Sequence, residues 1–243
     1  MTTRKVQNPN EKNGAGFIWA IVAVIVIAAL VIGLIFFNGK KDREAAMAEN
    51  MIDTSGITVS WNEDDHFIRL AAEGVDDAPM AELYEDFSCT HCADLAVATD
   101  KDMIEKLREG KIEVELRPMV TLDGLTNGHS TMGLAAELAL VANNEPAAMM
   151  NLRDHLMVNQ KDVYSKVTDD DLADLARDYG AGDKAVQDIR DKAYYDAARA
   201  MSNGNIKLQE ERTGEAWTPR VMVDGKDVEG DRDDWVNTVA NSK

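Results

Sequence analysis

The chain has only two cysteines, Cys89 and Cys92, and the pattern around them constrains the fold more than any other feature. The apolar-rich segment Met80–Phe87 predicts a strand that ends just before them. Residues 92–107 predict a helix or a broken pair of helices, and the alternating segment Lys111–Val120 predicts a second strand. A strand, a helix and a strand predict a parallel unit, with both cysteines at the first strand-to-helix turn.

Several kinds of site could use two cysteines at this spacing. A zinc site needs four ligands, and the chain offers two thiols and the scattered histidines His66, His129 and His155. Haem attachment needs histidine directly after the second cysteine, where Ala93 stands. A purely structural disulfide would close so short a loop that it contributes little chain entropy. A redox-active pair is favoured, with the structural and zinc alternatives left open.

The local chemistry supports redox activity. Cys89 would lie at the N-terminus of a helix, where unpaired N–H groups and the helix dipole favour an anion. A protonated His91 would add a second positive influence. Both effects lower the pKa of the Cys89 thiol, and a stabilised thiolate makes the disulfide more oxidising. Cys92, further into the helix, is then the resolving thiol.

The rest of the soluble part predicts strands at both ends and helices between them. A short hairpin is predicted around residues 62–65, and a second around Asp224-Gly225, with strands at residues 220–223 and 226–229. A final helix from Asp231 would bury Trp235 and Val239. The helices between are expected at residues 130–143 and 146–160, after Thr168 as far as Gly180, and from Asp183, with the last one before Gly214 interrupted at Ser202–Asn205.

This order resembles the thioredoxin fold of DsbA-like thiol–disulfide oxidoreductases. Cys89-Thr90-His91-Cys92 is similar to the C-P-H-C motif of that family, and Thr218-Pro219 stands before the hairpin as the family's Thr-Pro does. The resemblance covers roughly residues 57–241 and is nearest to the membrane-tethered oxidases of Gram-positive bacteria, particularly actinobacteria. It implies an α/β thioredoxin-like domain formed by residues 56–120 and 215–243, with a large inserted helical domain at residues 121–214.

The resemblance also implies roles for individual residues. The Thr218-Pro219 bond would be cis and face the disulfide, with the Thr218 backbone binding an extended substrate and the Pro219 ring keeping metals off the thiols. The family often has a buried acid beneath the motif that helps proton transfer. Glu82 and Glu85 are candidates, although either could be an exposed acid. Thr90 replaces the family's usual proline, which leaves the redox potential open.

Residues 17–37 are not typical of a globular domain. This run of 21 residues carries no charge, and at ~1.5 Å per residue a helix of this length spans about 31 Å, the thickness of a bilayer core. It predicts an uncleaved single-pass anchor between a cytoplasmic tail, residues 1–16, and a tether, residues 38–55. Flanking positive charges are balanced, so they do not set the orientation. The net charge of −18 argues against nucleic-acid binding.

The sequence therefore predicts a membrane-tethered disulfide oxidase with an extracytoplasmic catalytic domain. It would donate the Cys89–Cys92 disulfide to unfolded secreted or cell-envelope proteins, without a cofactor or metal. By family resemblance, a membrane quinone-linked oxidase would regenerate it, and it would be a monomer. Two alternatives remain: a reductase or isomerase of the same fold, and a non-enzymatic tethered binder, either a peptide holdase or a metallochaperone.

Overall fold

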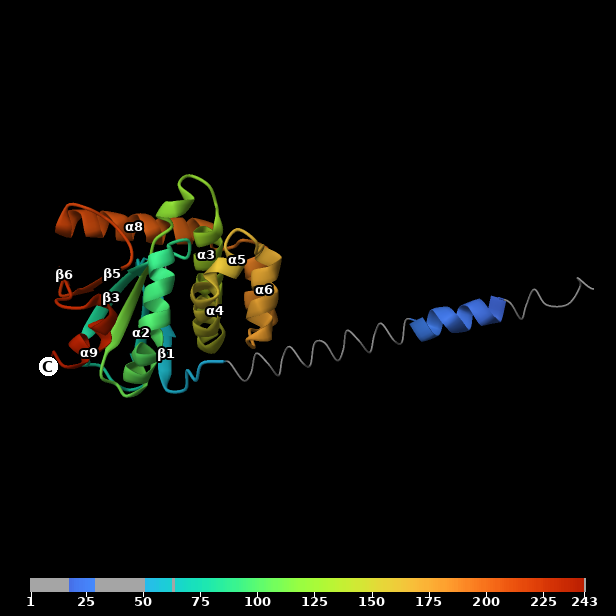
Figure 1. Ribbon diagram of the computed structural model, residues 1–243, viewed down its shortest axis with the longest axis horizontal. Helices are drawn as coiled ribbons and strands as arrows, with labels where there is room; N and C mark the ends of the chain where they lie inside the picture. Colours follow the sequence, from blue (N-terminus) through green and yellow to red (C-terminus); the bar gives the residue numbers. More distant parts are fainter. Residues whose placement is uncertain (1–17, 29–50, 63, 243) are drawn as a thin grey trace, which may run out of the picture. The chain divides into compact units, whose positions relative to one another are not determined.

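The computed structural model describes residues 18–28, 51–62 and 64–242. The chain divides into two units, residues 1–50 and 51–243. In the first, residues 18–28 are helical (Figure 1). Within the described ranges no helix has both the length and the apolar character needed to cross a membrane. The predicted tail, the remainder of the predicted span and most of the tether lie outside the described residues.

The second unit is built on one six-stranded sheet with strand order β1-β2-β4-β3-β5-β6. β3 runs parallel to β4, and all the other neighbouring strands are antiparallel. The parallel unit predicted around the cysteines is therefore confirmed, as are both hairpins. The strands are β1 (Ile57–Ser60), β2 (Ile68–Ala72), β3 (Met80–Glu85), β4 (Glu113–Pro118), β5 (Arg220–Val223) and β6 (Lys226–Asp227).

Helices occupy the connections that precede and follow β4. A single unbroken α2 (Thr90–Arg108) joins β3 to β4, and a series of helices joins β4 to β5 (Figure 1). The series consists of η1 (Thr121–Asp123), α3 (His129–Ala142), α4 (Pro146–Val158), α5 (Gln160–Val163), α6 (Asp169–Asp178), α7 (Asp183–Arg190) and α8 (Tyr195–Thr213). The chain then ends in η2 (Arg232–Asp234) and α9 (Trp235–Ala240), where Trp235 and Val239 are buried as predicted.

The two faces of the central strands differ in chemistry. Leu83 of β3 and Leu116 of β4 are register partners, and they line cavities together with side chains of α2 and α4. On the other face, Glu82 and Arg117 are buried and ion-paired 3.1 Å apart, and Arg117 donates to Asn205 of α8. One face thus packs Leu83 and Leu116 against α2 and α4, and the other carries a buried ion pair that is bonded to α8.

The interruption predicted at Ser202–Asn205 is wrong, because α8 is continuous from Tyr195 to Thr213. The residues that suggested a break are used in tertiary contacts. Ser202 Oγ accepts from Val120 N at 2.9 Å, and Asn205 Nδ2 donates to Pro118 O at 2.9 Å. Buried polar groups need such partners, so these side chains attach α8 to the end of β4.

Two local predictions can be compared with the backbone directly. α6 begins after Thr168 as predicted, and Thr168 caps it in a reciprocal capping box with Asp171. Asp224 and Gly225 have φ values of 49° and 73°, as a tight hairpin turn requires. The following strand is shorter than predicted: β6 ends at Asp227, and residues 228–229 do not continue it. The predicted domain boundaries at residues 120 and 215 stay a prediction.

Candidate active site

The two thiols lie at the start of α2, a few residues after the end of β3. Cys89 is the residue that caps α2, with extended backbone angles, and it is partly exposed. Cys92 lies in the first turn of the helix and is 3% exposed. Both are free thiols. The Cys92 N–H donates to Cys89 O at 3.0 Å, and the Asp86 N–H lies 3.4 Å from Cys92 Sγ. One thiol can therefore meet a partner while the other is shielded.

This placement separates the acidities of the thiols. The pKa of Cys89 falls to about 6, chiefly because the Cys92 thiol donates a hydrogen bond to it, although burial opposes the change. The backbone N–H of Cys92, the Thr218 side chain and the backbone N–H of His91 lower it further. The pKa of Cys92 is raised far above its usual value by the same hydrogen bond and by burial. Near neutral pH the pair therefore holds a Cys89 thiolate and a Cys92 thiol.

His91 acts on Cys89 through its backbone in this structure. Its N–H contributes to the lowered Cys89 pKa, while its side chain is 75% exposed and lies 3.9 Å from Asp94 Oδ2. The predicted effect of a protonated imidazole stays a prediction. The thiolate is already stabilised without it, by donors at the start of the helix.

Thr218 and Pro219 reach the thiols from the far end of the sequence. The peptide bond between them is cis, as the resemblance implies. Cys89 Sγ lies 3.6 Å from Thr218 O, and Pro219 lines the same pocket as Cys92. The sheet order explains this meeting, because β5 pairs directly with β3. The proposed binding of substrate by the Thr218 backbone stays a prediction.

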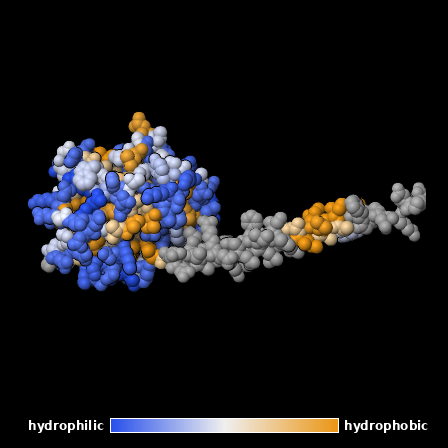
Figure 2. Space-filling view, in the orientation of Figure 1, coloured by the Kyte–Doolittle hydropathy of each residue, from blue (hydrophilic) through white to orange (hydrophobic). Residues whose placement is uncertain are grey.

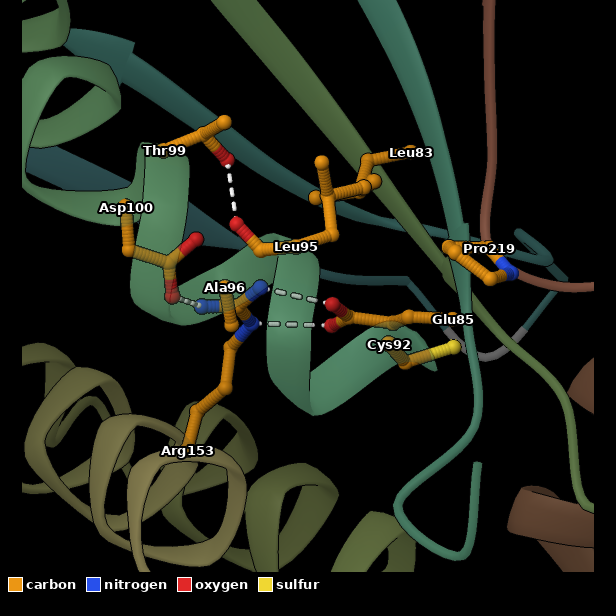
Figure 3. A pocket seen from close by; sticks show the side chains of 9 residues that line it. All are labelled: Leu83, Glu85, Cys92, Leu95, Ala96, Thr99, Asp100, Arg153 and Pro219. Carbon is orange, nitrogen blue, oxygen red and sulfur yellow. Dashed lines mark hydrogen bonds and ion pairs between the residues drawn. The ribbon is translucent and has the colours of Figure 1, made fainter. Parts of the chain in front are cut away.

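The two candidate acids, Glu82 and Glu85, lie in different surroundings. Both are buried, Glu82 at 5% and Glu85 at 3% exposure, so the alternative of exposed acids is wrong. Glu82 lies on the polar face of β3, where Tyr84 and Arg212 donate to it. Glu85 lines the pocket beneath Cys92 (Figure 3). Burial raises the pKa of the Glu85 carboxyl, while Arg153 opposes the shift.

Arg153 of α4 is a site residue that the sequence did not reveal. Its guanidinium donates to both Glu85 oxygens, at 2.8 and 2.6 Å, and to Asp100 Oδ2 at 2.5 Å. Figure 3 shows it reaching across the pocket between these two acids. The Arg153 side chain is 5% exposed. An arginine so buried needs such partners, but no local pattern in the sequence identifies them.

Two further residues hold the motif loop and were also missed. Gln160 Nε2 donates to Phe87 O at 2.7 Å and to Cys89 O at 3.0 Å. Asp86 accepts hydrogen bonds from the backbone N–H of Ser88 and from the hydroxyl of Ser130 at the start of α3. The helical insertion therefore fixes the loop that carries Cys89. Within the described part of the chain, no cluster of three or more metal-binding side chains occurs.

Alkylation rates should reveal the difference between the pKa values of the Cys89 and Cys92 thiols. The rate of Cys89 alkylation in the reduced protein should rise through a midpoint at pH about 6, because the reactive species is the thiolate. Cys92 should stay unreactive through neutral pH, because it is buried and protonated. Rates measured by mass spectrometry with a small haloacetamide provide the test.

The Cys92→Ala variant removes the largest cause of the shift, so its Cys89 midpoint should lie above pH 6. Cys92→Ser keeps a hydrogen-bond donor and serves as the matched control, with a smaller shift. A wild-type midpoint near the unperturbed thiol value of about 8.5 would contradict this account.

Comparison with known proteins agrees with this site. A family model described as Thioredoxin matches residues 71–239. The thiol–disulfide oxidoreductase MdbA of Corynebacterium diphtheriae is 34% identical, with a TM-score of 0.74, over 79% of this chain and 98% of that one. MdbA of Corynebacterium matruchotii is 30% identical, with a TM-score of 0.75, over 82% of this chain and 99% of that one.

More distant structures share the fold. DsbA of Mycobacterium tuberculosis, in its oxidised form, is 17% identical, with a TM-score of 0.58, over 72% of this chain and 93% of that one. No curated protein matches the sequence. The family match and the two MdbA structures lead to one conclusion: the chain belongs to the thioredoxin family and is a thiol–disulfide oxidoreductase of the DsbA and MdbA type.

Proposed function

We propose that this protein is a disulfide oxidase that donates its Cys89–Cys92 disulfide to secreted or cell-envelope proteins as they fold. The lowered pKa of Cys89, about 6, carries the proposal. The Cys89 thiolate stabilises the folded, reduced protein. This stabilisation is complete at pH values above the pKa of a thiol in the unfolded chain, and it is lost as the pH falls through about 6. Stabilising the reduced form makes the disulfide a stronger oxidant.

The exchange proceeds in two steps. A thiolate of the client attacks Cys89 Sγ, the bond between Cys89 and Cys92 breaks, and Cys92 leaves as a thiolate that takes up a proton. A second thiolate of the client then attacks the client sulfur that is bonded to Cys89, and Cys89 leaves as a stable thiolate. The client gains a disulfide, and the enzyme gains two electrons. Exposure of Cys89 and burial of Cys92 favour attack at Cys89.

The surroundings of Cys89 suit an extended, unfolded client. Thr218 O lies beside Cys89 Sγ and offers a backbone hydrogen-bond acceptor to a client strand. Trp217, the residue before Thr218, is 42% exposed, and Leu122, whose N–H bonds to Asp86, is 61% exposed. Trp217 and Leu122 therefore present large apolar side chains at the surface. Unfolded proteins present apolar side chains that such a surface can contact.

The alternatives fit these features less well. A reductase works best when its dithiol is easily oxidised, whereas a stabilised Cys89 thiolate has the opposite effect. A tethered holdase would not need thiols of such different acidity. The quinone-linked oxidase that would regenerate the disulfide, and a monomeric state, follow from the family resemblance alone and belong to this proposal.

We further propose that residues 17–37 anchor the protein in the cell membrane, with the N-terminus cytoplasmic and the catalytic domain outside. The run carries no charge over its whole length. Within the helix at residues 18–28, large apolar side chains such as Val24, Ile25 and Ile27 are exposed (Figure 2). A helix that is apolar all round needs an apolar environment. An oxidising compartment also suits a protein that donates disulfides.

Oxidative refolding tests the activity. The oxidised protein should restore activity to a reduced protein that requires disulfides, and Cys89→Ala should abolish this effect. Cys92→Ala, first loaded at Cys89 with glutathione by exchange with glutathione disulfide, should instead accumulate mixed disulfides: a client thiolate attacks Cys89 Sγ, glutathione leaves, and no Cys92 thiol is present to displace the client. Thr90→Ala alters the motif without removing a thiol and serves as the control. Refolding by the Cys89→Ala variant at the wild-type rate would exclude the proposed chemistry.

Fractionation of cells tests the anchor. The full chain should sediment with membranes and resist extraction by alkaline carbonate, and a protease added to cells without a wall should digest the catalytic domain. A variant lacking residues 1–50 should be released from the membrane fraction. A full chain found in the soluble cytoplasm would contradict the proposed location.

A further inference from the structure

Asp100 is a buried acid on α2, about two helical turns beyond Cys92, and the established chemistry leaves it without a role. It is 4% exposed. Its Oδ2 accepts from Arg153 Nη1 at 2.5 Å, while its Oδ1 has no hydrogen-bond partner among the described residues. Figure 3 shows the first oxygen bound to Arg153 and the second turned away from it. A buried carboxylate oxygen without a partner is costly, so it calls for an explanation.

Asp100 borders the space beneath the redox centre and also a groove at the surface. Asp100 lines the pocket that contains Cys92 and Glu85. It also lines a second cavity with Arg153 and Asp154, and it borders an open groove between α2 and α4 with Asp154 and Arg108. Asp100 belongs to all three spaces, and Asp154 belongs to the outer two. The two acids therefore line neighbouring spaces that lie between Cys92 and the surface groove.

The charges around these spaces suit proton exchange. Glu85 faces Asp100 from β3, and Arg153 and Asp154 face it from α4. Burial is the main cause that raises the pKa of the carboxyls of Glu85, Asp100 and Asp154. Glu137 of α3, buried beside Glu85 and Arg153, has its pKa raised well above the ordinary value. Raised values bring carboxyls nearer to the pH range in which they both bind and release protons.

We propose that Asp100 and Asp154 carry the proton exchanged at Cys92 between the pocket beneath this thiol and the groove between α2 and α4. When the disulfide is opened at Cys89, Cys92 leaves as a thiolate and takes a proton from this route. When Cys92 closes the disulfide, its thiol proton leaves by the route, its sulfur bonds to Cys89, and the displaced thiol departs as a thiolate. The inference rests on the resolving role proposed for Cys92.

Arg153 has a different part in this arrangement. A guanidinium does not release its proton in proteins, so it does not pass the proton on. It holds Glu85 through two hydrogen bonds and Asp100 through one, so that both carboxylates border the pocket. Arg153 is therefore a positioning residue, and the exchanging groups are the carboxylates.

A single-turnover reaction separates the two thiols. The reduced full chain, in mild detergent, is mixed with an excess of an aromatic disulfide that releases coloured nitrothiobenzoate. Attack by the Cys89 thiolate releases the first equivalent at a rate proportional to reagent concentration. Cys92 then displaces the second equivalent from Cys89 at a rate independent of reagent concentration. Only this second phase requires Cys92 to lose its proton.

Asp100→Asn and Asp154→Asn should slow the second phase by about tenfold or more, the scale of a lost proton-transfer group, and should flatten its pH profile. The first phase should stay within about twofold of wild type, which a general loss of structure would not allow. Asp102→Asn makes the same change at an exposed position of α2 and should alter neither phase. If Asp100→Asn fails to fold, the half-buried Asp154 still decides the question.

Second phases with wild-type rates and pH profiles in the acid variants would overturn the proton route and leave the proposed function standing. A wild-type protein that releases no second equivalent would overturn the resolving role of Cys92, and the route with it. The two failures are distinguishable because one appears only in the variants and the other appears in the wild type.

Discussion

The hydrogen bond from the Cys92 thiol to the Cys89 sulfur is the interaction on which the chemistry of this protein depends. It is the largest single cause of the low Cys89 pKa and of the high Cys92 pKa. It exists because Cys89 caps α2 and Cys92 stands in its first turn. The N–H groups at this helix start add to the same effect. The pair therefore shares one proton unequally, and the partly exposed Cys89 sulfur is the one that carries the negative charge.

The inserted helices do more than cover the sheet. Gln160 of α5 binds the loop on which Cys89 lies, and Ser130 of α3 binds Asp86 within it. Arg153 of α4 holds Glu85 beneath Cys92. Breaking a buried ion pair typically costs about 3–5 kcal/mol, whereas exposed pairs contribute about 0–1 kcal/mol. Loss of Arg153 would therefore disturb this region more than loss of a surface ion pair, because it would leave the buried carboxylates of Glu85 and Asp100 unpaired.

The sequence predicted the features that depend on local patterns. Strand alternation, the helix start after Thr168 and the turn at Asp224-Gly225 are all short-range signals, and the structure contains each of them. The ion pair between Glu85 and Arg153 could not be predicted from the sequence, because the two residues are 68 positions apart and no local pattern indicates that they meet. The wrong interruption in α8 has the same origin: Ser202 and Asn205 weaken an isolated helix, but here they bind β4 and the residues that follow it.

The reduction potential of the Cys89–Cys92 couple tests the central claim most directly. The protein would be equilibrated in glutathione buffers of known ratio, and its thiols counted after acid quenching. Stabilisation of the reduced form predicts a potential close to that of strong oxidants, about −120 mV for DsbA. A potential near the value of thioredoxin, about −270 mV, would show that the Cys89 thiolate does not stabilise the reduced form and would contradict the account.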